Sequence, residues 1–161
     1  MRDPFITIAG QTAPSPGILI MGDEVKVQTS EVLIQHISIR PGDLKVINGK
    51  LETDQDALQI SGPSDNVVID HVSLGWSTDE ALDIFGGVER VTLRHLLISH
   101  PLNEKDHGFN ALFYDGGSVY VHGGLFAHAA QRFPLSRIQN LIWANNLHYN
   151  RTLRFTQLSN I

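Results

Sequence analysis

The stretch Val67-Val68-Ile69-Asp70-His71-Val72-Ser73-Leu74 decides the fold, because four other segments of the chain share its pattern. Apolar and polar side chains alternate along it, and valine and isoleucine predominate, which is typical of a β-strand. The related segments span residues 32–39, 91–98, 119–126 and 141–148. Their fifth positions hold His36, His71, His95, Gly123 and Asn145, which lie 35, 24, 28 and 22 residues apart. The sequence therefore repeats with a period in the low twenties, interrupted by insertions.

A second series of short apolar runs begins at Ala57, Ala81 and Ala111, and the first two of these are again 24 residues apart. Turn-forming pairs such as Pro41-Gly42 and Gly86-Gly87 separate the runs. Short strands that repeat at this period without a helical pattern predict an all-β parallel β-helix, in which each turn of chain stacks on the last. An antiparallel sandwich is the alternative, but it does not require similar residues at a fixed period.

Composition limits the classes of protein and partner. The 161 residues, 42% hydrophobic and 18% charged, suit one packed domain over residues 1–161. A net charge of −5 without a basic cluster argues against a nucleic-acid partner, and no apolar run is long enough for a membrane partner. The chain has no cysteine, which excludes disulfides, thiolate zinc sites and cysteine nucleophiles.

Neither end of the sequence resembles the cap that a solenoid needs. A strand-like segment is already present at Phe5-Ile6-Thr7-Ile8, and the pattern still runs at Leu158-Ser159-Asn160-Ile161. We therefore expect the single β-helix domain to be truncated at both ends.

Two acidic stretches follow the same period as the strands. They are Asp54-Gln55-Asp56 and Asp79-Glu80-Ala81-Leu82-Asp83. The period places them on adjacent turns, about 4.8 Å apart, so their carboxylates should converge. Converging carboxylates repel one another unless they are protonated or bridged by a cation, and an all-oxygen ligand set suits Ca²⁺. The alternative is that these acids form an ordinary solvated surface.

Two further motifs invite a functional interpretation. Asp70-His71 has the form of a dyad in which aspartate orients a catalytic imidazole. However, His36 and His95 hold the same repeat position as His71, which favours a ladder of stacked histidines. Arg132-Phe133-Pro134-Leu135-Ser136-Arg137 sets two guanidinium groups, suited to carboxylate recognition, on either side of a proline. Two unconnected surface arginines are the alternative.

Taken together, these segments resemble the pectate lyase family of calcium-dependent polysaccharide lyases. Residues 66–71 are similar to its V-W-I-D-H motif, with Val68 in place of tryptophan. Asp54-Gln55-Asp56 resembles its D-x-D calcium pair, and Asp79 with Asp83 resembles its second acidic pair. Residues 132–137 satisfy its R-x-P-x-x-R motif. The resemblance implies a right-handed, single-stranded parallel β-helix, a solenoid of the pectin-lyase-like type.

The resemblance also implies roles for individual residues. Ca²⁺ would be the cofactor, held by Asp54, Asp56, Asp79 and Asp83. Arg132 would be the catalytic base, and Arg137 would bind substrate together with Lys105. The family commonly has lysines near two positions at which this chain has Phe85 and Phe109.

The expected function is that of a pectate-lyase-like carbon–oxygen lyase, which cleaves polygalacturonate or a related acidic polysaccharide by Ca²⁺-assisted β-elimination. Such an enzyme is expected to be a secreted or periplasmic monomer that takes part in pectin catabolism. Two alternatives stay open. One is a non-catalytic β-helix that binds carbohydrate or acts in adhesion, and the other is a glycoside hydrolase that uses two of the carboxylates.

Overall fold

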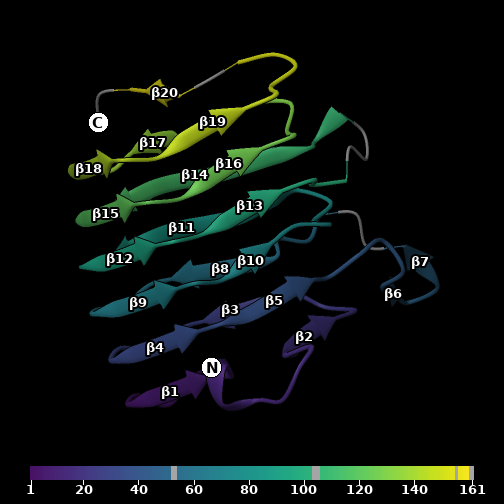
Figure 1. The fold of residues 1–161 in the computed structure, drawn as a ribbon. Coiled ribbons are helices and arrows are strands. Elements are labelled where there is room, and N and C mark those ends of the chain that lie inside the picture. Colours follow the sequence, from purple (N-terminus) through teal and green to yellow (C-terminus); the bar gives the residue numbers. More distant parts are fainter. Residues whose placement is uncertain (52–53, 103–105, 155, 160–161) are drawn as a thin grey trace.

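The computed structural model describes residues 1–51, 54–102, 106–154 and 156–159. Its strands form a parallel β-helix with three walls, each of which is a parallel sheet of six strands among the described residues (Figure 1). The chain passes through the first, second and third wall in turn and then begins the next rung. No helix in the described part of the chain is long and apolar enough to cross a membrane.

The three walls keep a constant strand order from one end of the stack to the other. The first wall contains β1 (Ile6–Ala9), β4 (Val32–Gln35), β9 (Val67–Asp70), β12 (Val91–Arg94), β15 (Ser118–His122) and β18 (Asn140–Ala144). The second contains β2 (Ile18–Met21), β5 (Ile37–Arg40), β10 (Ser73–Leu74), β13 (Leu97–Ser99), β16 (Leu125–Ala127) and β19 (Leu147–Tyr149). The third contains β3 (Val25–Val27), β8 (Leu58–Ser61), β11 (Glu80–Val88), β14 (Phe109–Gly116), β17 (Leu135–Arg137) and β20 (Gln157–Leu158).

The register confirms the repeat expected from the first series of apolar runs. Val32, Val67, Val91, Val119 and Leu141 are successive partners in the first wall. The alignment expected for the second series is off by one residue at its last member. Leu82 of β11, rather than Ala81, pairs with Ala111 of β14. The register in the third wall is set by how its strands pair, and the spacing of the alanines alone does not determine that pairing.

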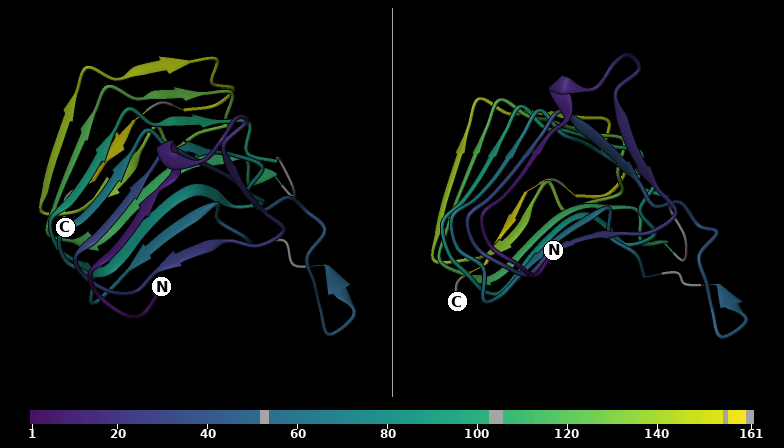
Figure 2. Two further views of the ribbon diagram at one scale, coloured as in Figure 1. Left: turned by 60° about the horizontal axis from the view of Figure 1, so that its bottom comes forward. Right: turned by 90° about the horizontal axis from the view of Figure 1, so that it is seen from below.

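Alternation within each strand builds the core. Residues at every second position point inward, so that side chains such as Ile34, Ile69 and Leu93 are fully buried in one column. Figure 2, which includes a view along the stack, shows the three walls around this interior. Burying a continuous apolar column is the main source of stability for a solenoid of this kind.

Two elements depart from the simple rung. A short 3₁₀ turn, η1 (Gly10–Thr12), lies between β1 and β2. An antiparallel hairpin of β6 (Val46–Ile47) and β7 (Lys50–Leu51) leaves the second rung between the second and third walls and stands away from the stack (Figure 2). The hairpin lies within the long first interval of 35 residues and leads towards the first acidic stretch.

Candidate functional site

The acidic stretches meet where the third wall begins. Asp56 lies just before β8, and Asp79 lies just before β11, the next strand of that wall. Asp56, Asp79 and Glu80 each bring a carboxylate oxygen within 4.8 Å of the other two. Asp83 follows on β11, where it pairs with Gln59 of β8. The expected convergence of carboxylates from adjacent rungs is therefore present, and Glu80 is an additional member.

The cluster makes ionisation of its own members unfavourable. Burial, followed by the charge of Asp83, raises the pKa of Asp56 to about 8. Burial, followed by the charge of Asp79, raises the pKa of Asp83 to about 7. The pKa of Asp79 is also raised, chiefly by burial, although His107 and Arg132 act in the opposite direction. Several partly buried carboxylates at this spacing need protons or a cation to remain close together.

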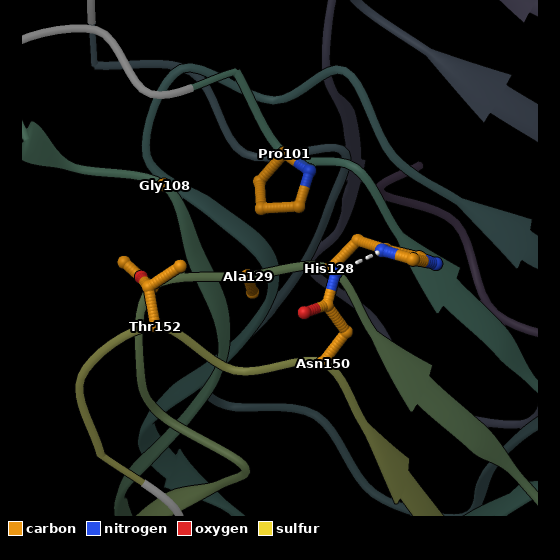
Figure 3. Close-up of a pocket in the computed structure, with 7 residues that line it drawn as sticks. Pro101, Gly108, His128, Ala129, Asn150 and Thr152 are labelled. Carbon is orange, nitrogen blue, oxygen red and sulfur yellow. Dashed lines mark hydrogen bonds between the residues drawn. The ribbon is translucent and has the colours of Figure 1, made fainter.

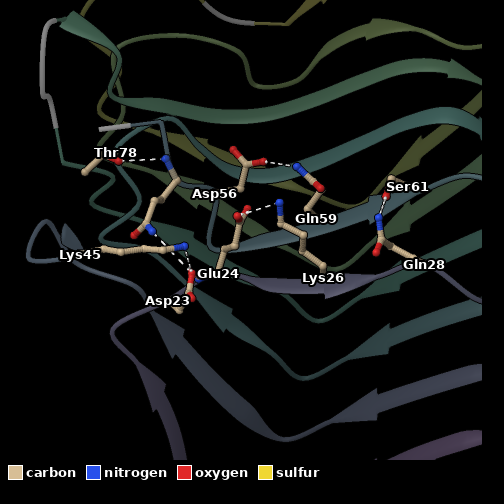
Figure 4. Close-up of polar contacts among 10 residues, drawn as sticks. Asp23, Glu24, Lys26, Gln28, Lys45, Asp56, Gln59, Ser61 and Thr78 are labelled. Carbon is tan, nitrogen blue, oxygen red and sulfur yellow. Dashed lines mark hydrogen bonds and ion pairs between the residues drawn. The ribbon is translucent and has the colours of Figure 1, made fainter. Parts of the chain in front are cut away.

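The neighbouring rungs extend the acidic character. Asp54 is exposed at the edge of the cluster, and its charge contributes to the raised pKa of Asp79. Glu24, one rung below, forms an ion pair of 2.8 Å with Lys26, and its charge helps to raise the pKa of Asp56. Figure 4 shows this side of the stack, where Gln59 Nε2 donates to Asp56 Oδ2 at 3.1 Å. Asp54, Asp56, Asp79 and Asp83 therefore all lie in one region, near the start of the third wall.

Arg132 reaches the same region from three rungs above Asp56. It lies between β16 and β17, forms an ion pair with Glu80, and places its guanidinium carbon 3.9 Å from the centre of the Phe109 ring. Burial lowers the pKa of this guanidinium, while the charges of Asp79 and Asp56 oppose that change. The structure thus brings a cation of reduced basicity into contact with the acidic cluster.

The second arginine of the motif lies on the outer face of the third wall. Arg137 ends β17 and is exposed, and it pairs with Tyr114 of β14, which pairs in turn with Phe85 of β11. Its Nε donates to Ser159 Oγ at 2.9 Å. Lys105 lies outside the described residues. Arg132 and Arg137 are thus not side by side, because one faces the carboxylates and the other faces an aromatic strip.

The histidine ladder is confirmed. The rings of His36 and His71 stack with their centres 4.6 Å apart, and those of His71 and His95 are 4.4 Å apart. Asp70 contacts Nδ1 of both His71 and His95. This arrangement lies at the corner between the first and second walls and is separate from the acidic cluster.

A small cavity opens near the turns that follow the second wall. It has a volume of about 210 Å³, and its lining includes Pro101, Gly108, His128, Asn150 and Thr152 (Figure 3). The polar groups of His128 and Asn150 contact each other at 2.8 Å. The described residues of the lining include no carboxylate, so they offer fewer charged ligands than the acidic cluster does.

Comparison with curated proteins finds relatives along most of the chain. Proteins named "Probable pectate lyase C" from Aspergillus flavus and Aspergillus terreus are 31% and 30% identical to it over 146 residues. A protein of the same name from Emericella nidulans is 30% identical over an alignment of the same length. Over most of its length the chain is therefore similar to proteins named as probable pectate lyases. Each alignment covers 90% of this chain and 32% of the relative, and no family model matches the chain.

The chain differs from the expected family pattern at two positions, Phe85 and Phe109, which the structure places differently. Phe85 lies on the outer face of β11 beside Tyr114, where its ring is partly exposed. Phe109 is buried, with 4% of its surface exposed, and forms the platform under Arg132. One replacement therefore adds to an aromatic surface, and the other supports the arginine.

Three residues of the site are absent from the set predicted from the sequence. Glu80 is the partner of Arg132, Glu24 lies below Asp56, and His107 Nδ1 is 3.8 Å from Asp79 Oδ1. Glu80 lies within the acidic stretch that the repeat identified. Its role as the partner of Arg132 could be recognised only once the position of Arg132 was known. No sequence signal points to Glu24 or His107, which reach the acidic cluster from other rungs and turns.

Proposed function

We propose that this chain carries the catalytic centre of a calcium-dependent polysaccharide lyase that cleaves polygalacturonate or a related acidic polysaccharide. The observation that carries the proposal is the ion pair of Arg132 with Glu80, whose carboxylate lies within 4.8 Å of those of Asp56 and Asp79. A base next to a cation site is the arrangement that removal of a proton beside a carboxylate requires. The names of the relatives support the same chemistry.

The acidic cluster fits a calcium ion. Its donors are all carboxylate oxygens, and Asp83 Oδ1 is buried without a hydrogen-bond partner among the described residues. Asp54, Asp56, Asp79 and Asp83 would hold the ion, and the raised pKa values of Asp56 and Asp83 mark the charge repulsion that it would relieve. When bound, the ion supplies positive charge that neutralises the substrate carboxylate and stabilises negative charge at the reacting carbon.

The residues of the chain would carry out the other steps of the reaction. Arg132 in its neutral form would take the C5 proton of the uronate. The electron pair of the C5–H bond would form the C4–C5 double bond while the bond from C4 to the glycosidic oxygen breaks, and that oxygen would leave as a hydroxyl with a proton from solvent. Its position on Phe109 and against Glu80 fixes the direction of the guanidinium. Arg137, on the outer face beside Tyr114, would bind a substrate carboxylate farther along the polymer. A polymeric substrate implies that the enzyme acts outside the cytoplasm, as a secreted or periplasmic protein.

A second candidate function is carbohydrate binding without catalysis. Phe85 and Tyr114 form an aromatic strip on the outer wall, and aromatic rings with exposed faces suit the apolar faces of sugars. In this function the acidic cluster would serve only to attach an acidic polymer through Ca²⁺.

Ultraviolet absorbance separates the two functions. The purified chain is mixed with polygalacturonate at alkaline pH, first with Ca²⁺ and then with a chelator, while the unsaturated product is followed. A calcium-dependent rise in absorbance supports the lyase. A flat trace from folded protein that retains calcium-dependent polymer binding supports the binding function, whereas new reducing ends without absorbance would indicate hydrolysis and contradict both.

A further inference from the structure

The motif around Asp70 forms a second cluster of ligand-type side chains, away from the acidic cluster. Asp70 ends β9 at the corner between the first and second walls, and His71 follows it. His95 occupies the equivalent position one rung above, after β12. Asp70 Oδ1 lies 2.7 Å from Nδ1 of His71 and 3.2 Å from Nδ1 of His95. One oxygen and two imidazole nitrogens therefore converge within 4.8 Å.

The second oxygen of Asp70 is fixed by the surrounding strands. Gln35 Nε2 donates to Oδ2 at 3.0 Å, and Arg94 Nη2 donates to it at 2.9 Å. Asp70 itself is 3% exposed. Burial opposes ionisation, but hydrogen bonds from His95, Arg94, Gln35 and His71 together hold its pKa well below the usual range. The carboxylate is thus ionised and oriented, as the surroundings of a metal-binding group usually ensure.

The two histidines remain accessible from solvent. The side chains of His71 and His95 are 47% and 44% exposed, so an ion can reach them without opening the core. Neutral imidazole and carboxylate are the ligands of zinc in open sites, at bond lengths of about 2.0–2.2 Å. Nitrogen ligands disfavour Ca²⁺, which prefers oxygen.

We propose that Asp70, His71 and His95 form a binding site for a divalent transition ion of the Zn²⁺ type, with a fourth position open to solvent. The ion would replace the hydrogen bonds between Asp70 Oδ1 and the two imidazoles. The site does not depend on the lyase proposal, because it lies at a different corner of the solenoid and uses none of the same residues.

Backbone geometry supplies a conservative way to remove the ligands. His71 and His95 have φ angles of 53° and 52°, in the left-handed region. Asn145 holds the same repeat position two rungs above His95 and has a φ of 53°. Asparagine tolerates this conformation, so His71→Asn with His95→Asn should keep the corner intact while removing both nitrogen ligands.

The chain also contains a matched control pair. His100 and His128 stack with their ring centres 4.3 Å apart, and their φ angles are 55° and 53°. Their Nδ1 atoms contact Ser99 Oγ and Asn150 Nδ2 rather than a carboxylate. His100→Asn with His128→Asn therefore removes two stacked, left-handed histidines without touching the proposed site.

Isothermal titration calorimetry with ZnCl₂ tests the proposal on the full chain in the presence of excess Ca²⁺, which occupies the acidic cluster. We expect one ion per chain, at least a tenfold loss of affinity in the His71→Asn/His95→Asn variant, and unchanged affinity in the His100→Asn/His128→Asn variant. Circular dichroism of both variants checks that they are folded. The absence of one-to-one binding, or equal affinity in the first variant and the unaltered chain, would overturn the proposal.

Discussion

Arg132 is the residue on which the proposed chemistry depends most directly, because it combines a partly buried guanidinium with an acidic partner. Lysine keeps the charge but loses the planar group that rests on Phe109. We expect Arg132→Lys to lower kcat by at least about 100-fold, the lower range for loss of a general base, with a smaller change in KM. Initial rates from ultraviolet absorbance provide the measurement.

The matched change for this experiment is Arg90→Lys, since Arg90 is an exposed arginine that pairs with Asp65 at a distant corner. It should leave kcat and KM unaltered. A normal turnover in Arg132→Lys would remove the base assignment while leaving the calcium site untouched.

Protons and calcium should compete for Asp56 and Asp83. Their pKa values are raised to about 8 and about 7, so these carboxylates are largely protonated at acidic pH and must release protons before they coordinate an ion. We expect Ca²⁺ affinity to rise at least about tenfold between pH 6 and pH 9. Calorimetry in buffers of different ionisation enthalpy should show protons released on binding at pH 7. A constant affinity without proton release would contradict the assignment of these two ligands.

The same pKa shifts make a prediction about stability without calcium. A carboxyl group whose pKa is raised by folding binds more protons in the folded state, so stability falls as pH rises through the interval between the two values. For Asp56 and Asp83 that interval runs from about 4 to about 8.

In the presence of chelator, we therefore expect Tm to be lower at pH 8 than at pH 5 by at least about 3 °C, the effect of about 1 kcal/mol in a chain of this size. Asp56→Asn with Asp83→Asn should flatten this dependence. A steeper fall of Tm in the double variant would show that other groups cause it. Differential scanning fluorimetry across the pH series is sufficient.

At the scale of the element, close contact between rungs makes some glycines irreplaceable. Gly75 follows β10, and a Cβ atom built on it would lie 2.1 Å from the backbone oxygen of Ser99 at the end of β13. We expect Gly75→Ala to destabilise the fold by about 1–3 kcal/mol, the usual cost of overpacking. Gly42→Asn is the comparison, because Gly42 has a φ of 78° and open space around its Cβ position. Urea unfolding should show little change for Gly42→Asn, and equal losses in the two variants would refute the steric explanation.

Strands were the part of this molecule most open to prediction from sequence. Alternating valine and isoleucine at a period near 24 fixes both the strand type and its stacking partners, as the column from Val32 to Leu141 shows. Turn conformations and the register near Ala111 were not predictable, because they depend on how many residues each corner absorbs. A local pattern carries no information on that number.

The residues of the acidic site likewise include some that the sequence predicts and some that it does not. The acids just before β8 and at the start of β11 were predictable, since the repeat brings equivalent positions together. Glu24 and His107 join the cluster from other rungs and turns, so their proximity follows from tertiary structure alone. The contact between Arg132 and Phe109 likewise required the path of the chain between β16 and β17.

For the molecule as a whole, stability should vary along the axis of the stack. Rungs near the middle have neighbours on both sides, whereas β1 and β2 at one end, and β18 and β19 at the other, pair on one side only. Ile18 and Leu19 in β2, and Leu147 in β19, are correspondingly exposed. We expect amides of β9 and β12 to exchange with solvent at least about tenfold more slowly than those of the end strands, as in other repeat proteins.

Hydrogen–deuterium exchange with mass spectrometry gives this profile directly. Uniform protection from β1 to β19 would mean that the chain unfolds as a single cooperative unit. Addition of Ca²⁺ should slow exchange mainly around β8 and β11, which provides a local control within the same experiment.

The position of the hairpin of β6 and β7 affects which parts of such a chain can vary during evolution. A substitution inside a wall must be compatible with the packing of the strands above and below it. The length of a corner can vary, provided that the chain enters the next wall in register. The hairpin occupies the corner that leads into Asp54 and Asp56. Insertion or deletion at this single corner can therefore alter the surroundings of the acidic cluster while the contacts of the interior are retained.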